Sequence, residues 1–206
     1  MLYSKTFLQS LHRRLAEISV TSSSLRNQGN AGLIAASRNY LYNNISLDEF
    51  FRSLAHERSC RKFLDRHTVL LDKHLPGGGR FKRWGAARKI LNLFFRELVY
   101  NKILCDEYGV PRRPSDYNRI LLYLEVPLDK DVATGILRNS TMPLPQWIGV
   151  KYLLPEVSKE YQDAANLIAE SQGIPRIHLD LDYWRPTSKS QPKKRPDSRL
   201  PLSKKA

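Results

Sequence analysis

Apolar side chains recur every three or four residues along most of the chain. Phe7, Leu8, Leu11, Leu15 and Ile18 repeat in this way, and this spacing places apolar residues on one face of a helix. No stretch alternates apolar and polar residues over the length of a convincing strand. The pattern therefore predicts an all-α protein. Its helices are expected at about 5–18, 30–43, 46–54, 64–75, 85–107, 117–124, 129–138, 155–173 and 178–184.

Several predicted helix ends carry their own local signals. Ser46 precedes Glu49 by three residues, the arrangement of a capping box. Pro155 and Gly173 stand where a helix favours proline at its first position and glycine after its last. The run Pro76-Gly77-Gly78-Gly79 is a strong break between two helices.

The charge of the chain narrows its choice of partners. Among 206 residues, 34 Lys and Arg face 20 Asp and Glu, a net charge of +14. Residues 189–206 hold seven of the cations and one of the acids, which leaves +8 on residues 1–188. We expect one helical domain over 1–188 and a disordered basic tail over 189–206. A basic body favours nucleic acid, an acidic membrane surface or ribosomal assembly.

Other patterns are absent from the sequence. Cys60 and Cys105 form neither a CxxC metal motif nor a disulfide framework. No apolar run approaches the roughly 20 residues of a membrane span, and Met1 to Lys5 begin no signal-peptide pattern. These features predict a cytoplasmic, nucleoid-associated protein without a membrane partner.

Two residues carry the candidate chemistry. Lys89 lies in an apolar helix, on a face with Asn92, Leu93 and Arg96. A lysine forms Schiff bases with carbonyl carbons once its amine is neutral, although a solvated helix face is the more common explanation of a lone lysine. Asp129 follows a proline turn and reads either as a helix N-cap or as a carboxylate that steers a sugar cation or a proton. Both roles are compatible, and Asp131 is the rival position.

The glycine-rich break is a candidate phosphate site. Glycine amides and a following helix N-terminus favour an anion, although an exposed flexible loop is the plainer interpretation. The break is followed by interleaved cationic and aromatic residues, namely Arg80, Phe81, Lys82, Arg83 and Trp84.

A second polar cluster stands near the end of the domain. His178, Asp180 and Asp182 alternate with apolar residues. They could ligate a metal, but they read more simply as structural hydrogen-bonding groups.

Two segments together resemble the helix-hairpin-helix DNA glycosylases. The first is Arg88-Lys89-Ile90-Leu91-Asn92, and the second is Pro127-Leu128-Asp129-Lys130-Asp131-Val132. The lysine–aspartate separation and the closing segment Ile177 to Trp184 look most like the archaeal 8-oxoguanine glycosylase branch. The resemblance spans about residues 75–185, with the hairpin and catalytic segment over about 75–140.

The resemblance implies a fold and an activity. The fold would be a glycosylase-like helical bundle with a cleft between two helical lobes. A monomeric enzyme would flip a modified base out of duplex DNA and excise it, with Lys89 attacking C1′ and Asp129 stabilising the sugar cation. An abasic-site lyase step could follow, and the base could be an oxidised purine or a bulky modified pyrimidine such as a phage-modified cytosine, in repair or in phage defence.

The same resemblance implies the remaining site residues. No cofactor or metal is expected, since the four-cysteine iron–sulfur loop of other relatives is absent. The hairpin is either an extended Leu75–Gly79 turn or the segment 83–86. Candidate base-stacking residues are Trp84, Trp147 and Trp184. Candidate DNA-binding residues are Gly77, Gly78, Gly79, Arg80, Lys82, Arg83, Gly85 and Arg88.

Two other functions remain open from the sequence. A non-catalytic DNA- or RNA-binding protein needs only the basic surface and the glycine turn. A metal-dependent nuclease would use His178, Asp180 and Asp182.

Overall fold

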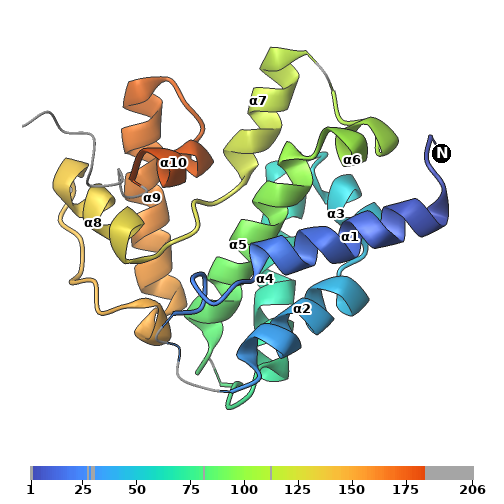
Figure 1. Ribbon diagram of the computed structural model, residues 1–206. Helices are drawn as coiled ribbons and strands as arrows, with labels where there is room; N and C mark the ends of the chain where they lie inside the picture. Colours follow the sequence, from blue (N-terminus) through green and yellow to red (C-terminus); the bar gives the residue numbers. More distant parts are fainter. Residues whose placement is uncertain (1, 27, 29–30, 81, 112, 184–206) are drawn as a thin grey trace, which may run out of the picture.

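The computed structural model describes residues 2–26, 28, 31–80, 82–111 and 113–183, and these contain helices and no strand (Figure 1). The predicted all-α class is confirmed for this part of the chain. The basic tail 189–206 and Trp184 lie outside the described residues. The elements are α1 (Lys5–Ser19), α2 (Leu33–Asn44), α3 (Leu47–Ser53), α4 (Glu57–His74), α5 (Trp84–Tyr100), α6 (Lys102–Glu107), α7 (Pro114–Tyr123), α8 (Lys130–Asn139), η1 (Val150–Tyr152), α9 (Pro155–Gln172), η2 (Arg176–His178) and α10 (Leu179–Tyr183).

Most predicted helix ends are confirmed, because local side chains fix them. The Ser46 hydroxyl accepts a hydrogen bond from the Glu49 amide and caps α3. Pro155 begins α9, and Gly173 ends it in the left-handed conformation at φ 68°. The single helix predicted over 85–107 is wrong. Asn101 ends α5, and its side chain accepts a hydrogen bond from the Leu104 amide to begin α6.

Two other helices differ from the predicted pattern. Helix α4 begins at Glu57, well before the predicted start at residue 64, because its buried face continues through Cys60 and Phe63. In α1 the apolar stripe is only partly buried. Phe7 and Ile18 are exposed, while His12 takes a core position with its Nε2 3.0 Å from the Leu41 carbonyl oxygen.

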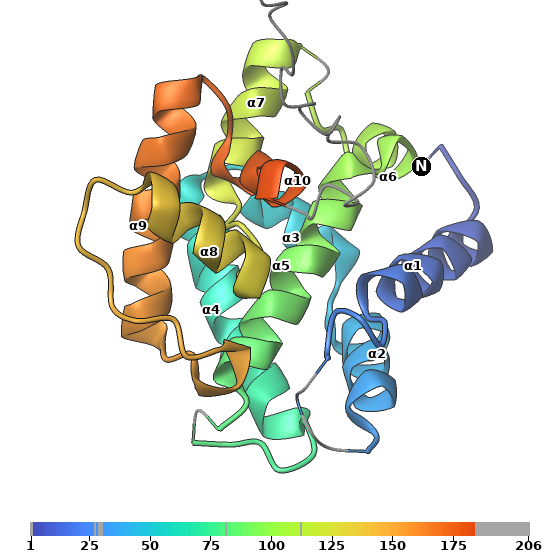
Figure 2. The ribbon, with the colours of Figure 1, turned by 60° about the vertical axis from the view of Figure 1, so that its left-hand side comes forward.

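Helix α5 runs through the middle of the protein. Helices α1 and α2 lie on one side of it and α8 and α9 on the other, in both ribbon views (Figure 1, Figure 2). Even its polar residues Arg88, Lys89 and Asn92 are buried. The first half of α5, which carries these residues, is therefore enclosed by the surrounding elements.

The apolar core forms two clusters. The larger joins side chains of α1 to α7, and the smaller joins α8, α9 and α10 with Trp84 and Leu153. Trp147 packs against both clusters. No helix within the described ranges is long and apolar enough to cross a membrane.

Candidate active site

Lys89 and Asp129 come together although 40 residues separate them. Lys89 lies in the second turn of α5, and its side chain is only 9% exposed. Its Nζ is 3.4 Å from Asp129 Oδ2. The solvated helix face that explains most lone lysines does not apply here, because the Lys89 side chain is almost entirely buried.

The two carboxylate oxygens of Asp129 have different roles. Oδ1 accepts hydrogen bonds from the amides of Asp131 and Val132, both at 3.0 Å, and so caps α8. Oδ2 faces the Lys89 ammonium. The N-cap and the charge partner are thus one side chain, and the capping bonds fix the direction of the free oxygen.

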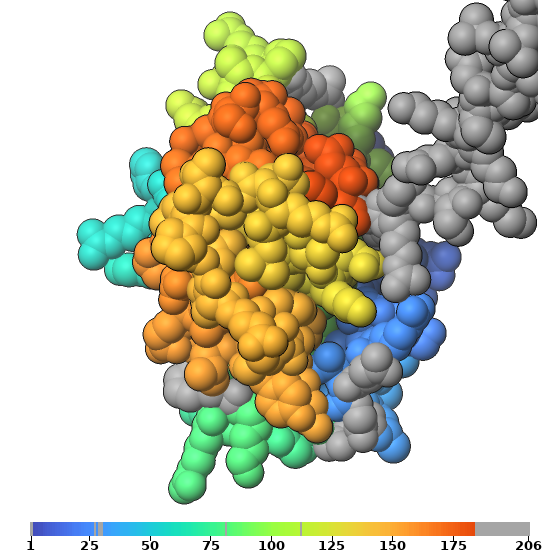
Figure 3. All heavy atoms as spheres, turned by 90° about the vertical axis from the view of Figure 1, so that its left-hand side faces the viewer, coloured from blue at the N-terminus to red at the C-terminus, as the bar shows by residue number. Residues whose placement is uncertain are grey.

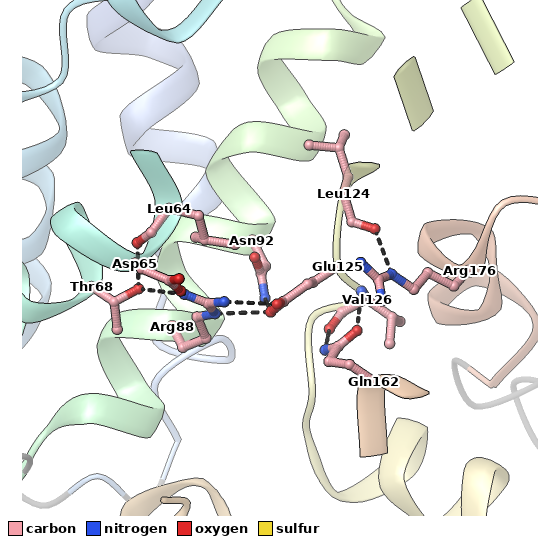
Figure 4. A network of polar contacts seen from close by, with 10 residues as sticks. All are labelled: Leu64, Asp65, Thr68, Arg88, Asn92, Leu124, Glu125, Val126, Gln162 and Arg176. Atoms are coloured by element: carbon pink, nitrogen blue, oxygen red, sulfur yellow. Dashed lines mark hydrogen bonds and ion pairs between the residues drawn. The ribbon is translucent and has the colours of Figure 1, made fainter. Parts of the chain in front are cut away.

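A buried network fixes the segment that leads into Asp129. Arg88 donates to both oxygens of Glu125, at 2.7 and 2.8 Å, and Asn92 donates to the same carboxylate (Figure 4). Residues 124–128 are all buried. Because Arg88 precedes Lys89 and Glu125 lies four residues before Asp129, this ion pair sets the spacing of the candidate catalytic pair.

Two further side chains hold the backbone of the same segment. Gln162 of α9 donates to the Val126 carbonyl at 2.7 Å and accepts from the Val126 amide at 3.1 Å. Arg176 donates to the Leu124 carbonyl at 2.9 Å (Figure 4). These bonds satisfy the Leu124 carbonyl and both backbone groups of Val126, as buried backbone requires.

The pair opens into a cavity of about 880 Å³. Lys89, Leu93 and Arg96 form its α5 wall at i, i+4 and i+7, which is one side of a helix. Asp129 and Asp180 line it from α8 and α10. The other lining residues come from the end of α1 and the segment after it, from the first turn of α8, and from the segment before α9 that includes η1: Ile18, Ser19, Thr21, Ser23, Ser24, Arg26, Gln28, Lys130, Asp131, Val132, Trp147, Ile148, Gly149, Val150, Lys151 and Tyr152.

Asp180 adds a second acid to the cavity. Arg96 donates a hydrogen bond to its Oδ2. Burial raises the pKa of Asp180 above its ordinary value, Arg96 opposes that shift, and the Asp129 charge adds to it. Around the candidate pair, Lys89 and Arg96 of α5 thus face two acids, Asp129 and Asp180.

The glycine-rich turn is built differently from the predicted phosphate cradle. The Gly78 amide donates to Leu75 O at 2.8 Å, and the Gly79 amide donates to Asp72 O at 3.0 Å. These amides close the C-terminal end of α4, so they do not point to an external anion. Gly77 is exposed with φ 68°. Arg80 and Lys82 are exposed and remain available to a phosphate.

Three of the predicted DNA-binding residues are buried for packing reasons. Arg83 donates to the Gln28 carbonyl at 2.6 Å, and Arg88 is committed to Glu125. A Cβ on Gly85 would stand 2.2 Å from the Val150 carbonyl oxygen, so Gly85 allows η1 to approach α5. The prediction that these three residues contact DNA directly is therefore revised.

The three tryptophans have different positions. Trp147 lines the cavity, and its ring centroid lies 5.3 Å from that of Tyr161 in an edge-on arrangement. Trp84 is buried in the smaller core cluster, so it offers no stacking surface, and that prediction is revised. Trp184 lies outside the described residues.

The polar residues near α10 do not gather as a metal site. Asp180 pairs with Arg96. Within the described ranges, no three His, Cys, Asp or Glu side chains are grouped as metal ligands. A nuclease metal centre built on His178, Asp180 and Asp182 therefore has no geometric support.

The sequence patterns missed Glu125 as a positioning group. Its signal was an isolated acid in the apolar run Leu121 to Leu128. Buried acids are rare unless they are paired, so an acid in this run could have been read as a sign of a buried cation partner. The identity of that cation, Arg88, depended on the tertiary fold.

The comparisons with known proteins add no relative. No protein-family model matches the chain, and no curated protein or solved structure was found to be significantly similar to it.

Proposed function

We propose that this protein is a monomeric DNA glycosylase that excises a modified base, and that the Lys89–Asp129 pair carries the reaction. The observation that supports the proposal most strongly is the 3.4 Å approach of a buried ammonium to a fixed carboxylate at the wall of a large cavity. Val150 of the larger core cluster and Val132 of the smaller one both line the cavity, which is consistent with a cleft between two helical lobes. The net charge of +14 suits a polyanionic substrate. With DNA as that substrate, the protein would be associated with the nucleoid in the cytoplasm.

The chemistry follows from the positions of the two groups. An everted nucleotide enters the cavity with its C1′ near Lys89. As the bond from C1′ to the base nitrogen breaks, its electron pair leaves with the base, and the sugar acquires positive charge. Asp129 Oδ2 stabilises that charge, because a fixed anion costs no reorganisation at the moment of reaction.

Lys89 then supplies the nucleophile. Its ammonium gives a proton to Asp129, which passes it to the departing base, and the free amine attacks C1′ to form a covalent bond to the sugar. As the ring opens, the proton lost from the attached nitrogen moves to the ring oxygen. The ring opens to a Schiff base, from which loss of a 2′ proton expels the 3′ phosphate. Hydrolysis of the Schiff base restores the free lysine, so the protein is consumed in neither step.

The two substrate classes favoured by the sequence remain the candidates. They are an oxidised purine and a bulky modified pyrimidine such as a phage-modified cytosine. The first belongs to repair and the second to defence against phage DNA. At about 880 Å³ the cavity is at the upper end of the range for small-molecule sites, so it admits either base.

A panel of duplexes tests the proposal. Each duplex carries one modified base, and alkaline cleavage of the abasic product reports base release under single-turnover conditions. We expect wild-type protein to release at least one base. Tight binding to every duplex with release from none would contradict the proposal and would support the alternative, a non-catalytic nucleic-acid-binding protein.

A further inference from the structure

The mouth of the cavity carries exposed apolar side chains on an anchored segment. Ile148 is 61% exposed and Tyr152 is 58% exposed, and both line the cavity. Between them, Val150 is buried, and the following Leu153 is buried in the smaller core cluster. The segment is therefore held from below while two large apolar groups face solvent.

Two glycines explain the path of this segment. Gly85, at the start of α5, has no Cβ and so lets the Val150 carbonyl and Leu153 pack directly on the helix. Gly149 adopts φ 103°, a conformation that side chains rarely take, and turns the chain between Ile148 and Val150. In Figure 3 the orange segment between α8 and α9 lies at the surface, next to the blue N-terminal part of the chain.

Exposed cations flank the apolar pair. Arg26, Lys130 and Lys151 all line the cavity and are exposed. None of the three is ion-paired within the described residues, whereas Arg88 and Arg96 deeper in the protein are committed to carboxylates. Lys151 also lies over the Tyr152 ring, with its Nζ 5.5 Å from the centroid.

The glycine-rich turn offers much less to a phosphate. Its Gly78 and Gly79 amides are used inside the protein, and Arg83 is buried. Among the charged residues predicted to bind phosphate there, Arg80 and Lys82 are exposed and still able to do so. The surface with both charge and apolar side chains is instead the rim of the cavity.

We infer that this rim, formed by Arg26, Lys130, Ile148, Lys151 and Tyr152, is the surface that docks duplex DNA. The inference rests on the proposed function. The three cations bind phosphates on either side of the everted nucleotide, and Ile148 and Tyr152 enter the base stack at the gap it leaves. Apolar and aromatic side chains serve as such wedges, because base surfaces that lose a stacking partner gain a new one.

Salt-dependent binding tests the charged part of the rim. The probe is a duplex with a single stable abasic-site analogue, and affinity is measured over a range of salt concentrations. Each of Arg26→Ala, Lys130→Ala and Lys151→Ala is expected to lower the slope of log affinity against log salt by about 0.9. Lys159→Ala is the matched control, since Lys159 is an exposed cation of α9 paired with Asp163, and it is expected to leave the slope unchanged.

Fluorescence tests the apolar part of the rim. A fluorescent purine analogue beside the abasic site reports disturbance of its stacking when wild-type protein binds. Ile148→Ala and Tyr152→Ala are expected to reduce that signal, and Tyr152→Ala to weaken affinity roughly tenfold, as loss of one aromatic stacking contact does. Leu167→Ala is the control, because Leu167 is an exposed apolar residue of α9 that does not line the cavity.

The outcomes separate the inference from the proposed function. If the rim variants kept the wild-type slope while Arg80→Ala and Lys82→Ala lowered it, the inference would be wrong and the duplex would bind at the glycine-rich turn. The proposed function would still stand if the protein continued to release a base. A wild-type protein that neither binds duplex DNA nor releases a base would overturn both. Unchanged thermal unfolding of each variant shows that the substitutions act on binding, since all are at exposed positions.

Discussion

Arg88 and Glu125 form a buried ion pair directly behind the candidate catalytic pair. Both guanidinium–carboxylate bonds are shorter than 3 Å, and both side chains are less than 10% exposed. Burial alone would raise the pKa of Glu125, but the adjacent Arg88 charge holds it below its ordinary value. The acid thus stays ionised, and the pair ties α5 to the segment that ends at Asp129.

We therefore predict that Glu125→Gln lowers the free energy of unfolding by about 3–5 kcal/mol, because it leaves a buried guanidinium without its main counter-charge. Denaturant titration measures this. Asp65→Asn is the matched control, since Asp65 also accepts from Arg88 at 2.7 Å, but its side chain is 57% exposed. It should cost less than about 1 kcal/mol. Equal losses in the two variants would contradict the structural role given to Glu125.

The two roles of Asp129 can be separated by stability. Asparagine also caps helices well, whereas alanine does not. Asp129→Ala should therefore be about 1 kcal/mol less stable than Asp129→Asn, although both lose the ion pair with Lys89. Denaturant titration in a Lys89→Met background removes the ion-pair contribution and should preserve the difference. Equal stability of the two variants would show that the Oδ1 bonds to α8 contribute nothing.

The sequence predicted those parts of the site that depend on local rules. Asp129 was recognised as a cap because it follows a proline turn, and Lys89 was placed on the same face as Leu93 and Arg96 by helical geometry. The Arg88–Glu125 pair could not be predicted, since nothing local joins residues 37 positions apart.

The glycine turn shows the same limit. Its composition predicted free amides. In the structure the Gly79 amide donates to the Asp72 carbonyl and the Gly78 amide donates to the Leu75 carbonyl. Both bonds form because α4 ends directly before the glycines. Gly85 was likewise assigned to phosphate binding, whereas its role depends on η1, more than 60 residues away in the sequence. Distant packing contacts of this kind leave no periodic signal.

Acid should destabilise the protein through His67. Burial, together with the nearby Arg66 charge, lowers the pKa of His67 to about 4. Because the unfolded chain takes up that proton near pH 6.5, stability should fall as the pH drops from about 6.5 to about 4, by about 3 kcal/mol. Thermal unfolding across this range measures the loss.

The control for this pH dependence is a second histidine. His67→Gln should reduce the dependence between pH 6.5 and 4, and the remainder is expected from His12 and His178, since burial lowers the pKa of each. His74→Gln, at an exposed position, should leave the dependence as in wild type. A His67→Gln variant with the full wild-type slope would show that other groups cause the acid sensitivity.

Lys89 should be trapped on DNA. If its amine attacks C1′, borohydride reduces the Schiff base to a stable covalent adduct of protein and cleaved strand. We expect wild-type protein to form this adduct with the base-modified duplex and Lys89→Gln to form none. Lys159→Gln controls for general loss of positive charge. An adduct that persists in Lys89→Gln would assign the nucleophile to another amine.

The most direct measurement compares base release by Asp129→Asn and Asp131→Asn under single-turnover conditions. The two carboxylates stand two residues apart at the start of α8, and both line the cavity, but only Asp129 faces Lys89. The account predicts that Asp129→Asn is slower than wild type by about a hundredfold or more, while Asp131→Asn stays within a few-fold of it. Wild-type release by Asp129→Asn, or the reverse order of the two variants, would contradict it.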